Sequence, residues 1–321
     1  MNRGSKFILK TLRWLYSEAF GKVQLLKPSC ILDSDIASQE IFNALTSPEP
    51  RMIARFGSNE LVCMTNYIGV KAKQRHWIKY IRGTALPWWW EPAVIRQMNI
   101  CAGFFPPNIP ALEYFSELMI QDTELVDILG SWLPNEECFA QQLQRTKRVH
   151  LELLNPYFSK SPWTRALEGK KVLVIHPFAA TIQAQYKRRE LLFANNLLPA
   201  FELKTIKAVQ SIAGEKTEFD TWFDALDHMK AQMDQVDYDI CLIGCGAYGF
   251  PLAAHAKRMG NVGFHLGGSL QLLFGIRGKR WENPDYNPVY NYAALMNEHW
   301  VKPAEEERPV AANKVEGACY W

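Results

Sequence analysis

The hydrophobic pattern of this chain becomes regular after residue 170, where short apolar runs alternate with amphipathic segments. We predict strands at 171–177, 202–209, 239–243 and 262–266, each followed by a helical pattern. The first of these runs is apolar on both faces, which is typical of a central parallel strand. Strands that alternate with helices indicate an α/β fold, with a Rossmann-like, mostly parallel sheet and helices on both faces.

The first half of the chain contains one further predicted strand, at 51–56, which leads into a turn and then a helix. From about 86 to 150 the pattern is helical and interrupted by prolines, so we predict a helical insertion there rather than more sheet. Residues 277–321 are rich in Pro, Asn and Trp and are expected to wrap around the domain. We therefore expect a single α/β domain over residues 29–321.

Residues 1–28 are expected to form a separate, basic amphipathic helix. Apolar residues recur at helical spacing within 6–20, and Lys6, Lys10 and Arg13 lie outside that stripe. Such a helix either lies on an anionic membrane surface or packs on its own domain, and the sequence leaves both open. No stretch has the length and apolarity of a signal sequence or a membrane span. We expect a cytoplasmic protein, with peripheral contact to the inner face of the cell membrane through residues 6–20 as one alternative.

Composition and charge narrow the class of protein. The 321 residues are 48% hydrophobic and 21% charged, as in globular proteins that bury a sizeable core. The net charge is +3 at pH 7 and we find no dense basic run, so the sequence gives no support to nucleic-acid binding. The seven cysteines form no C-x-x-C pair and no zinc-like cluster, which favours free thiols in a reducing compartment.

A glycine-rich turn, Gly244-Cys245-Gly246-Ala247-Tyr248-Gly249, follows the predicted strand at 239–243. Such a turn before a helix presents backbone N–H groups and the positive end of the helix dipole, an arrangement that suits phosphate. Its G-x-G-x-x-G spacing is typical of dinucleotide sites, but the strand at 261–266 ends without the acidic residue that would hold a ribose. We predict a site for a nucleotide or phosphorylated ligand, with a plain tight turn as the alternative. A Rossmann enzyme that uses NAD or S-adenosylmethionine is disfavoured by the missing acid.

Four predicted strands end in polar or glycine-rich turns, and the carboxyl ends of parallel strands meet at one edge of a sheet. We therefore expect these turns to border one crevice that binds a small molecule. The residues expected to contact the ligand there are Gly57, Ser58, His176, Gly244, Gly246, Tyr248, Gly249, His265, Gly267, Gly268, Gln271, Arg277, Lys279 and Arg280.

Three side chains near the first turn are candidates for catalysis. Glu60, beside Asn59, is suited to act as a general base or to hold a metal ion, and equally to complement the helix dipole. Arg55 is suited either to a phosphate group or to a structural ion pair. His176 and His265 end two other strands, where each either donates a hydrogen bond to a ligand or serves the structure.

A resemblance to a known family rests on several motifs. The segment Arg55-Phe56-Gly57-Ser58-Asn59-Glu60-Leu61 resembles the R-F-G-D-G-E segment of bacterial glycosyltransferases with the GT-D fold. The segments 239–249, 265–275, 279–281, 297–303 and 315–321 look like the C-terminal half of a bacterial subgroup allied to that fold. The resemblance spans roughly residues 51–321, and its first motif is the one shared with the characterised transferases.

The resemblance implies transfer of a sugar from a nucleotide-diphosphate donor to a polysaccharide, glycolipid or glycoprotein acceptor in bacterial surface glycan synthesis. In the family, an acidic pair lies at the donor diphosphate and its metal ion, Mn²⁺ or Mg²⁺. Glu60 matches the second acid, and Ser58 replaces the first. Serine is a poor ligand for these ions, so the cations Arg277, Lys279 and Arg280 are an alternative to the metal. The other alternative is a non-catalytic nucleotide- or carbohydrate-binding partner in a polysaccharide-assembly complex.

Overall fold

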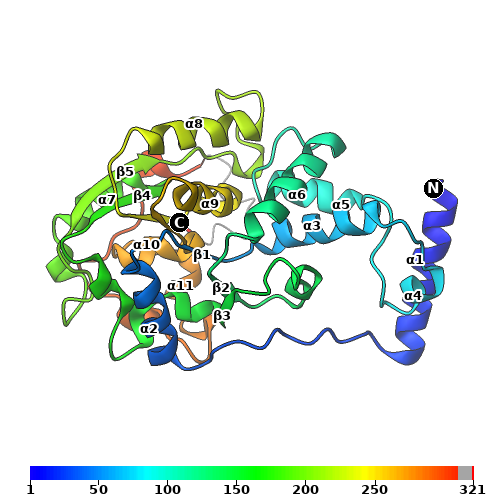
Figure 1. Ribbon diagram of the computed structural model, residues 1–321, viewed down its shortest axis with the longest axis horizontal. Coiled ribbons are helices and arrows are strands. Elements are labelled where there is room, and N and C mark those ends of the chain that lie inside the picture. The colour runs from blue at the N-terminus through cyan, green and yellow to red at the C-terminus, as the bar shows by residue number, and fades with distance from the viewer. Residues whose placement is uncertain (310–319) are drawn as a thin grey trace.

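The structure is a computed structural model that describes residues 1–309 and 320–321, and it contains one sheet of seven parallel strands (Figure 1). The strand order is β3-β2-β1-β7-β6-β4-β5. The strands are β1 (Met52–Ala54), β2 (Ile128–Ser131), β3 (Lys147–His150), β4 (Lys171–His176), β5 (Glu202–Lys207), β6 (Ile240–Ile243) and β7 (Val262–His265). The Rossmann-like α/β prediction is therefore confirmed.

Helices cover both faces of the sheet because its strands are apolar on both sides. In β4, Leu173 and Ile175 join the core on one face, while Val172 and Val174 join the core on the other. The first face is covered by α3 (Ser58–Lys71), α5 (Pro92–Ile100), α6 (Ile109–Thr123), α8 (Trp222–Asp234) and α9 (Gly249–Arg258). The second is covered by α2 (Ser34–Leu45), α7 (Ala179–Tyr186) and α10 (Leu270–Leu273).

The segment from 86 to 150 is helical only in part. Helices α5 and α6 lie within it, but β2 and β3 are strands that extend the sheet from β1. The prediction of helix rather than sheet is therefore wrong for these eight positions. Both strands are only four residues long, and a short apolar run gives no periodicity that separates a strand from a helix.

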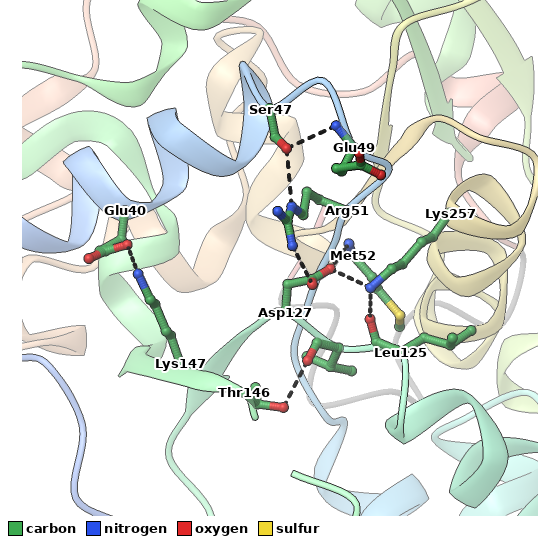
Figure 2. A network of polar contacts seen from close by, with 11 residues as sticks. Glu40, Ser47, Glu49, Arg51, Met52, Leu125, Asp127, Thr146, Lys147 and Lys257 are labelled. Atoms are coloured by element: carbon green, nitrogen blue, oxygen red, sulfur yellow. Dashed lines mark hydrogen bonds and ion pairs between the residues drawn. The ribbon is translucent and has the colours of Figure 1, made fainter. Parts of the chain in front are cut away.

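A polar network fixes the amino-terminal edge of the sheet, at the opposite end of the strands from their glycine-rich turns (Figure 2). The Asp127 carboxylate accepts hydrogen bonds from the Met52 backbone N–H at 2.7 Å, from Arg51 at 3.1 Å and from Lys257 at 2.6 Å. The Lys257 ammonium also donates to the Leu125 carbonyl at 2.7 Å. The network ties the starts of β1 and β2 to α9 and so sets the register of the central strands.

The C-terminal segment returns to the domain after the short helix α11 (Lys279–Glu282). Ile276 and Val301 form a parallel bridge, and Trp321 packs in the core of the second face. The Glu307 carboxylate accepts hydrogen bonds from Thr181 and from the Ala180 backbone N–H at the start of α7. The motif expected at 315–321 lies mostly outside the described residues.

The N-terminal helix α1 (Arg3–Phe20) packs against the short helix α4 (Trp77–Ile81) at one end of the molecule (Figure 1). Its contact with the domain is narrow, because Leu9 is its single buried residue and joins a small cluster with Tyr80 and Trp89. None of the helices in the described part of the chain has the length and apolarity needed to cross a membrane.

Candidate functional site

A cavity of about 210 Å³ lies beyond the carboxyl ends of β1, β7, β6 and β4, which are adjacent at the centre of the sheet. From the centre of the sheet, β1 connects to β2 on one side and β4 connects to β5 on the other. In parallel sheets, a crevice opens where neighbouring connections run in opposite directions. Fourteen of the seventeen residues expected to form the site line this cavity. They are Arg55, Gly57, Ser58, Asn59, Glu60, His176, Gly244, Gly246, Tyr248, His265, Gly267, Gly268, Gln271 and Arg280.

The remaining three predicted residues do not line the cavity. Gly249 begins α9, and a Cβ there would lie 2.1 Å from Nδ1 of His265, so this glycine makes room for the imidazole ring. Arg277 is half-buried, and its backbone N–H donates to the Val301 carbonyl at 2.7 Å. Lys279 is exposed at the start of α11. Of the three cations in the loop at 277–280, Arg280 is therefore the one that lines the cavity.

The turn after β1 places the Glu60 carboxylate over the start of α3. Gly57, rather than Ser58 or Asn59, is the N-cap residue, and no side chain caps this helix. A Cβ at position 57 would lie 1.8 Å from Oε2 of Glu60, so the carboxylate folds back over the glycine. Glutamate at the third helical position is stabilised there by the free N–H groups and by the helix dipole.

Glu60 is a buried acid with two groups nearby that favour its charged form. Burial raises the pKa of its carboxyl above the ordinary value, and it outweighs the hydrogen bond from its own backbone N–H and the charge of Arg55. A carboxylate with a raised pKa is a stronger base, and it lies in a cavity open to a ligand. Burial therefore makes the Glu60 carboxylate a stronger base than that of an exposed glutamate.

Arg55 extends from the end of β1 into the same cavity. Its guanidinium donates to the Phe56 carbonyl at 2.9 Å and lies 5.4 Å from the centre of the Trp132 ring. Its Nε is buried without a hydrogen-bond partner, and among the described residues no carboxylate lies within 4 Å of it. An arginine without an acidic partner carries its full positive charge into the cavity, where it attracts anions.

The turn after β6 packs closely against its neighbours. A Cβ at Gly244 would lie 2.7 Å from both the Gly267 carbonyl oxygen and the His176 ring, so only glycine fits without displacing them. Gly246 adopts a φ of +58°, which also favours glycine. The turn then enters α9 through Tyr248, whose ring stacks on Trp222 at 4.8 Å and whose hydroxyl lies 3.0 Å from Oγ of Ser211.

The two strand-end histidines are neutral. Burial lowers the pKa of His176 to about 3, and burial together with the charge of Arg55 lowers the pKa of His265 to about 3. The backbone N–H of Phe178 donates to Nδ1 of His176 at 3.0 Å, so the ring proton lies on Nε2. His176 can therefore donate one hydrogen bond to a ligand without contributing charge.

Sequence reasoning missed several residues that line the cavity. Trp132 follows β2, and its indole N–H donates to the Phe56 carbonyl at 3.2 Å, which places its ring beside Arg55. It was missed because β2 was not predicted as a strand. The other lining residues are Cys101, Ala102, Pro177, Phe178, Val209, Gln210, Ser211, Ile212, Cys245, Tyr320 and Trp321. The signal that could have found 209–212 is their position at and directly after the end of the strand predicted at 202–209.

The described residues that line the cavity do not by themselves provide the ligands of a metal site. Glu60 is the single carboxylate among the described residues that line the cavity, and Ser58 stands where a second acid would be needed. The described part of the chain contains no group of three metal-ligating side chains. Mn²⁺ and Mg²⁺ require several oxygen ligands, and the cationic side chains among the described lining residues are Arg55 and Arg280.

Comparisons with known proteins give one result for the family. A sequence model of the GT-D fold-like domain matches residues 32–273, which is more than half of the chain. The match covers the sheet and all four of the strand-end turns that border the cavity. No curated protein and no solved structure matches the chain.

Proposed function

The chain belongs to the GT-D fold-like family, and we propose that it is a glycosyltransferase that moves a sugar from a nucleotide-diphosphate donor to a glycan acceptor. The observation that carries the proposal is the pairing of an acid and a cation in one cavity. Glu60 is a buried base, and Arg55 is a cation without a carboxylate partner among the described residues. Glycosyl transfer needs both, because the acceptor loses a proton and the leaving diphosphate gains negative charge.

The donor diphosphate would lie over the turns that begin at Gly244 and Gly267, beside Arg55. These turns are built of glycine, so the backbone can approach the phosphate oxygens closely. Nε2 of His176 would donate a hydrogen bond to the donor. The aromatic rings of Trp132 and Tyr320 border the same cavity and suit the flat faces of a base or a sugar.

In the reaction, the acceptor hydroxyl oxygen forms a bond to the anomeric carbon, and the bond from that carbon to the diphosphate oxygen breaks. The hydroxyl proton goes to the Glu60 carboxylate, and the charge on the departing diphosphate is balanced by Arg55. Asn59 borders the cavity beside Glu60 and is suited to orient the acceptor hydroxyl. If a divalent ion takes part, it would arrive bound to the donor, since Glu60 is the one side-chain carboxylate among the described lining residues.

The proposal is tested by replacing Glu60 with Gln and assaying transfer and donor hydrolysis with a panel of nucleotide sugars and bacterial glycan acceptors. Loss of the base should reduce turnover by about 10²-fold or more, while nucleotide binding persists. Near-normal turnover in E60Q would remove Glu60 from the mechanism.

A second candidate function is a non-catalytic nucleotide- or carbohydrate-binding subunit of a polysaccharide-assembly complex. The observation that favours it is Ser58, since the described lining of the cavity carries one acidic side chain where the resembled transferases carry two. Donor binding by the wild-type protein without transfer or hydrolysis, across a broad set of acceptors, would support this function over the transferase. Under either function, we propose a role in the synthesis of bacterial surface glycans at the cytoplasmic side of the membrane.

A further inference from the structure

The apolar stripe of α1 faces away from the domain. At 100° per residue, Ile8, Leu12, Leu15 and Ala19 share one side of the helix, and all four are exposed. Leu9, on another side, packs in a cluster with Tyr80 of α4 and Trp89. Packing against its own domain therefore does not explain the amphipathic pattern of this helix.

Exposed apolar side chains are concentrated at this end of the molecule. We define the α1–α4 end as residues 1–23 and 72–82, whose two parts are joined by the packing of α1 on α4 (Figure 1). Val23 also lies beside Gly83. It holds ten of the 21 large hydrophobic side chains exposed in the described residues. They are Met1, Phe7, Ile8, Leu12, Trp14, Leu15, Phe20, Val23, Trp77 and Ile78. So many exposed apolar groups at one end of the molecule indicate a partner.

Charge at the α1–α4 end differs from charge in the rest of the chain. This end contains nine of the 36 Lys and Arg residues and one of the 33 Asp and Glu residues, so the remainder of the chain is net acidic. Folding brings together two basic segments that are about fifty residues apart in sequence. Neither segment on its own is a dense run of Lys and Arg residues. A cavity of about 370 Å³ between them is lined by four cations, namely Lys10, Arg13, Lys22 and Arg82.

We propose that the α1–α4 end is a membrane-docking surface that binds the anionic leaflet of a lipid bilayer. Exposed apolar groups enter the boundary between headgroups and acyl chains, and the basic groups beside them bind lipid phosphates. Trp14 and Trp77 are amphipathic rings that favour this depth in a bilayer. The excess of positive charge is the reason to assign lipid rather than a second copy of the chain, since two such ends would repel each other.

The docking surface is tested with the full chain and with vesicles of phosphatidylcholine, alone or mixed with phosphatidylglycerol. Three triple variants are compared by co-sedimentation. The first, I8Q/L12Q/L15Q, removes the apolar stripe, and the second, K73Q/R75Q/K79Q, removes basic groups near α4. The matched control, L191Q/M259Q/V289Q, changes three exposed apolar residues elsewhere.

The wild type and the control should bind the anionic vesicles, and both should bind more weakly at high salt. Each of the other two variants should bind at least about tenfold more weakly, with an unchanged thermal midpoint and unchanged nucleotide binding. Failure of the wild type to bind anionic vesicles would overturn the proposal, as would equal binding to neutral vesicles. A wild-type dimer in light scattering that I8Q/L12Q/L15Q converts to a monomer, without vesicle binding, would assign the surface to a second copy instead.

Discussion

The carboxylate of Glu60 occupies the space beside the Gly57 Cα in which a side chain would lie, with Oε2 1.8 Å from the position of a Cβ. A substituent at position 57 must therefore displace the proposed base. The exchange Gly57→Ala should reduce transfer by about 10²-fold through this displacement, because small errors in the position of a catalytic group are costly.

The positioning role of Gly57 is separated from a structural one by a double-mutant comparison of kcat. If Gly57 acts through Glu60, then G57A should cost little more activity when Glu60 is already Gln. A full additional loss in the double variant would show that Gly57 affects activity by another route. The thermal midpoints of all three variants serve as the control for folding.

Burial of Glu60 should make the stability of the protein depend on pH. Its pKa is raised in the folded state, so above the pKa of an unfolded glutamate, about 4.3, the folded protein binds more protons than the unfolded chain. The stability of the wild type therefore falls as the pH rises from the unfolded pKa to the raised pKa of Glu60. E60Q lacks this ionisable group, so its stability does not fall for this reason. The stability of E60Q relative to wild type should rise with pH from about 4 and level off above the raised pKa, as measured by urea unfolding.

The matched control for this experiment is E168Q, which changes an exposed glutamate outside the cavity. A stability difference between E60Q and wild type that stays constant with pH would contradict the burial of a charged base at this site.

His176 and His265 should remain neutral throughout the physiological range, because the pKa of each lies at about 3 in the folded protein. The unfolded chain takes up these protons at about pH 6.5, so the stability they contribute is present above that pH and is lost as the pH falls toward 3. Nitrogen-15 NMR should show His176 with its proton on Nε2 and without titration between about pH 5 and 8. A histidine signal from the cavity that titrates near neutrality would refute this assignment.

Asp127 should be important for stability and unimportant for chemistry. It accepts three hydrogen bonds at the edge of the sheet opposite the cavity, one of them from the Met52 backbone (Figure 2). Asp127→Ala leaves these donors without a partner and should lower the free energy of unfolding by about 2–4 kcal/mol. The control E40A, which breaks an exposed pair with Lys147, should cost less than about 1 kcal/mol.

Activity per folded molecule should be unchanged in both variants. A large loss of kcat in D127A at a temperature where it is fully folded would mean that the amino edge of the sheet influences the site.

Sequence patterns located the ends of the central strands well because glycine-rich turns there interrupt clear apolar runs. Gly244, Gly267 and Glu60 all lie at the cavity as expected from the topology of parallel sheets. Strand β2 was not predicted, since its four residues are as compatible with a buried helix, and Trp132 was missed with it. Strand β2 and Trp132 were therefore missed for the same reason.

Other features depend on tertiary contacts that periodicity does not encode. The pattern of α1 predicted an amphipathic helix correctly, but it gave no information on which side would face the domain. Likewise, nothing in the sequence of the Gly57-Ser58-Asn59 turn indicates that the Glu60 carboxylate folds back over Gly57 at the start of α3. The direction of a long side chain is decided by its neighbours in space.

The cavity is proposed to bind the diphosphate of a nucleotide sugar through Arg55. A binding titration tests this proposal most directly. Thermal-shift and calorimetric titrations with UDP, GDP, dTDP and CDP, with and without Mn²⁺, should show saturable binding of at least one nucleotide. R55Q should weaken that binding at least about tenfold, since a charge-assisted hydrogen bond is lost. The control R96Q, which changes an exposed arginine on α5, should bind as the wild type does. Binding of NAD or S-adenosylmethionine alone, or equal nucleotide affinity in R55Q and wild type, would contradict the account.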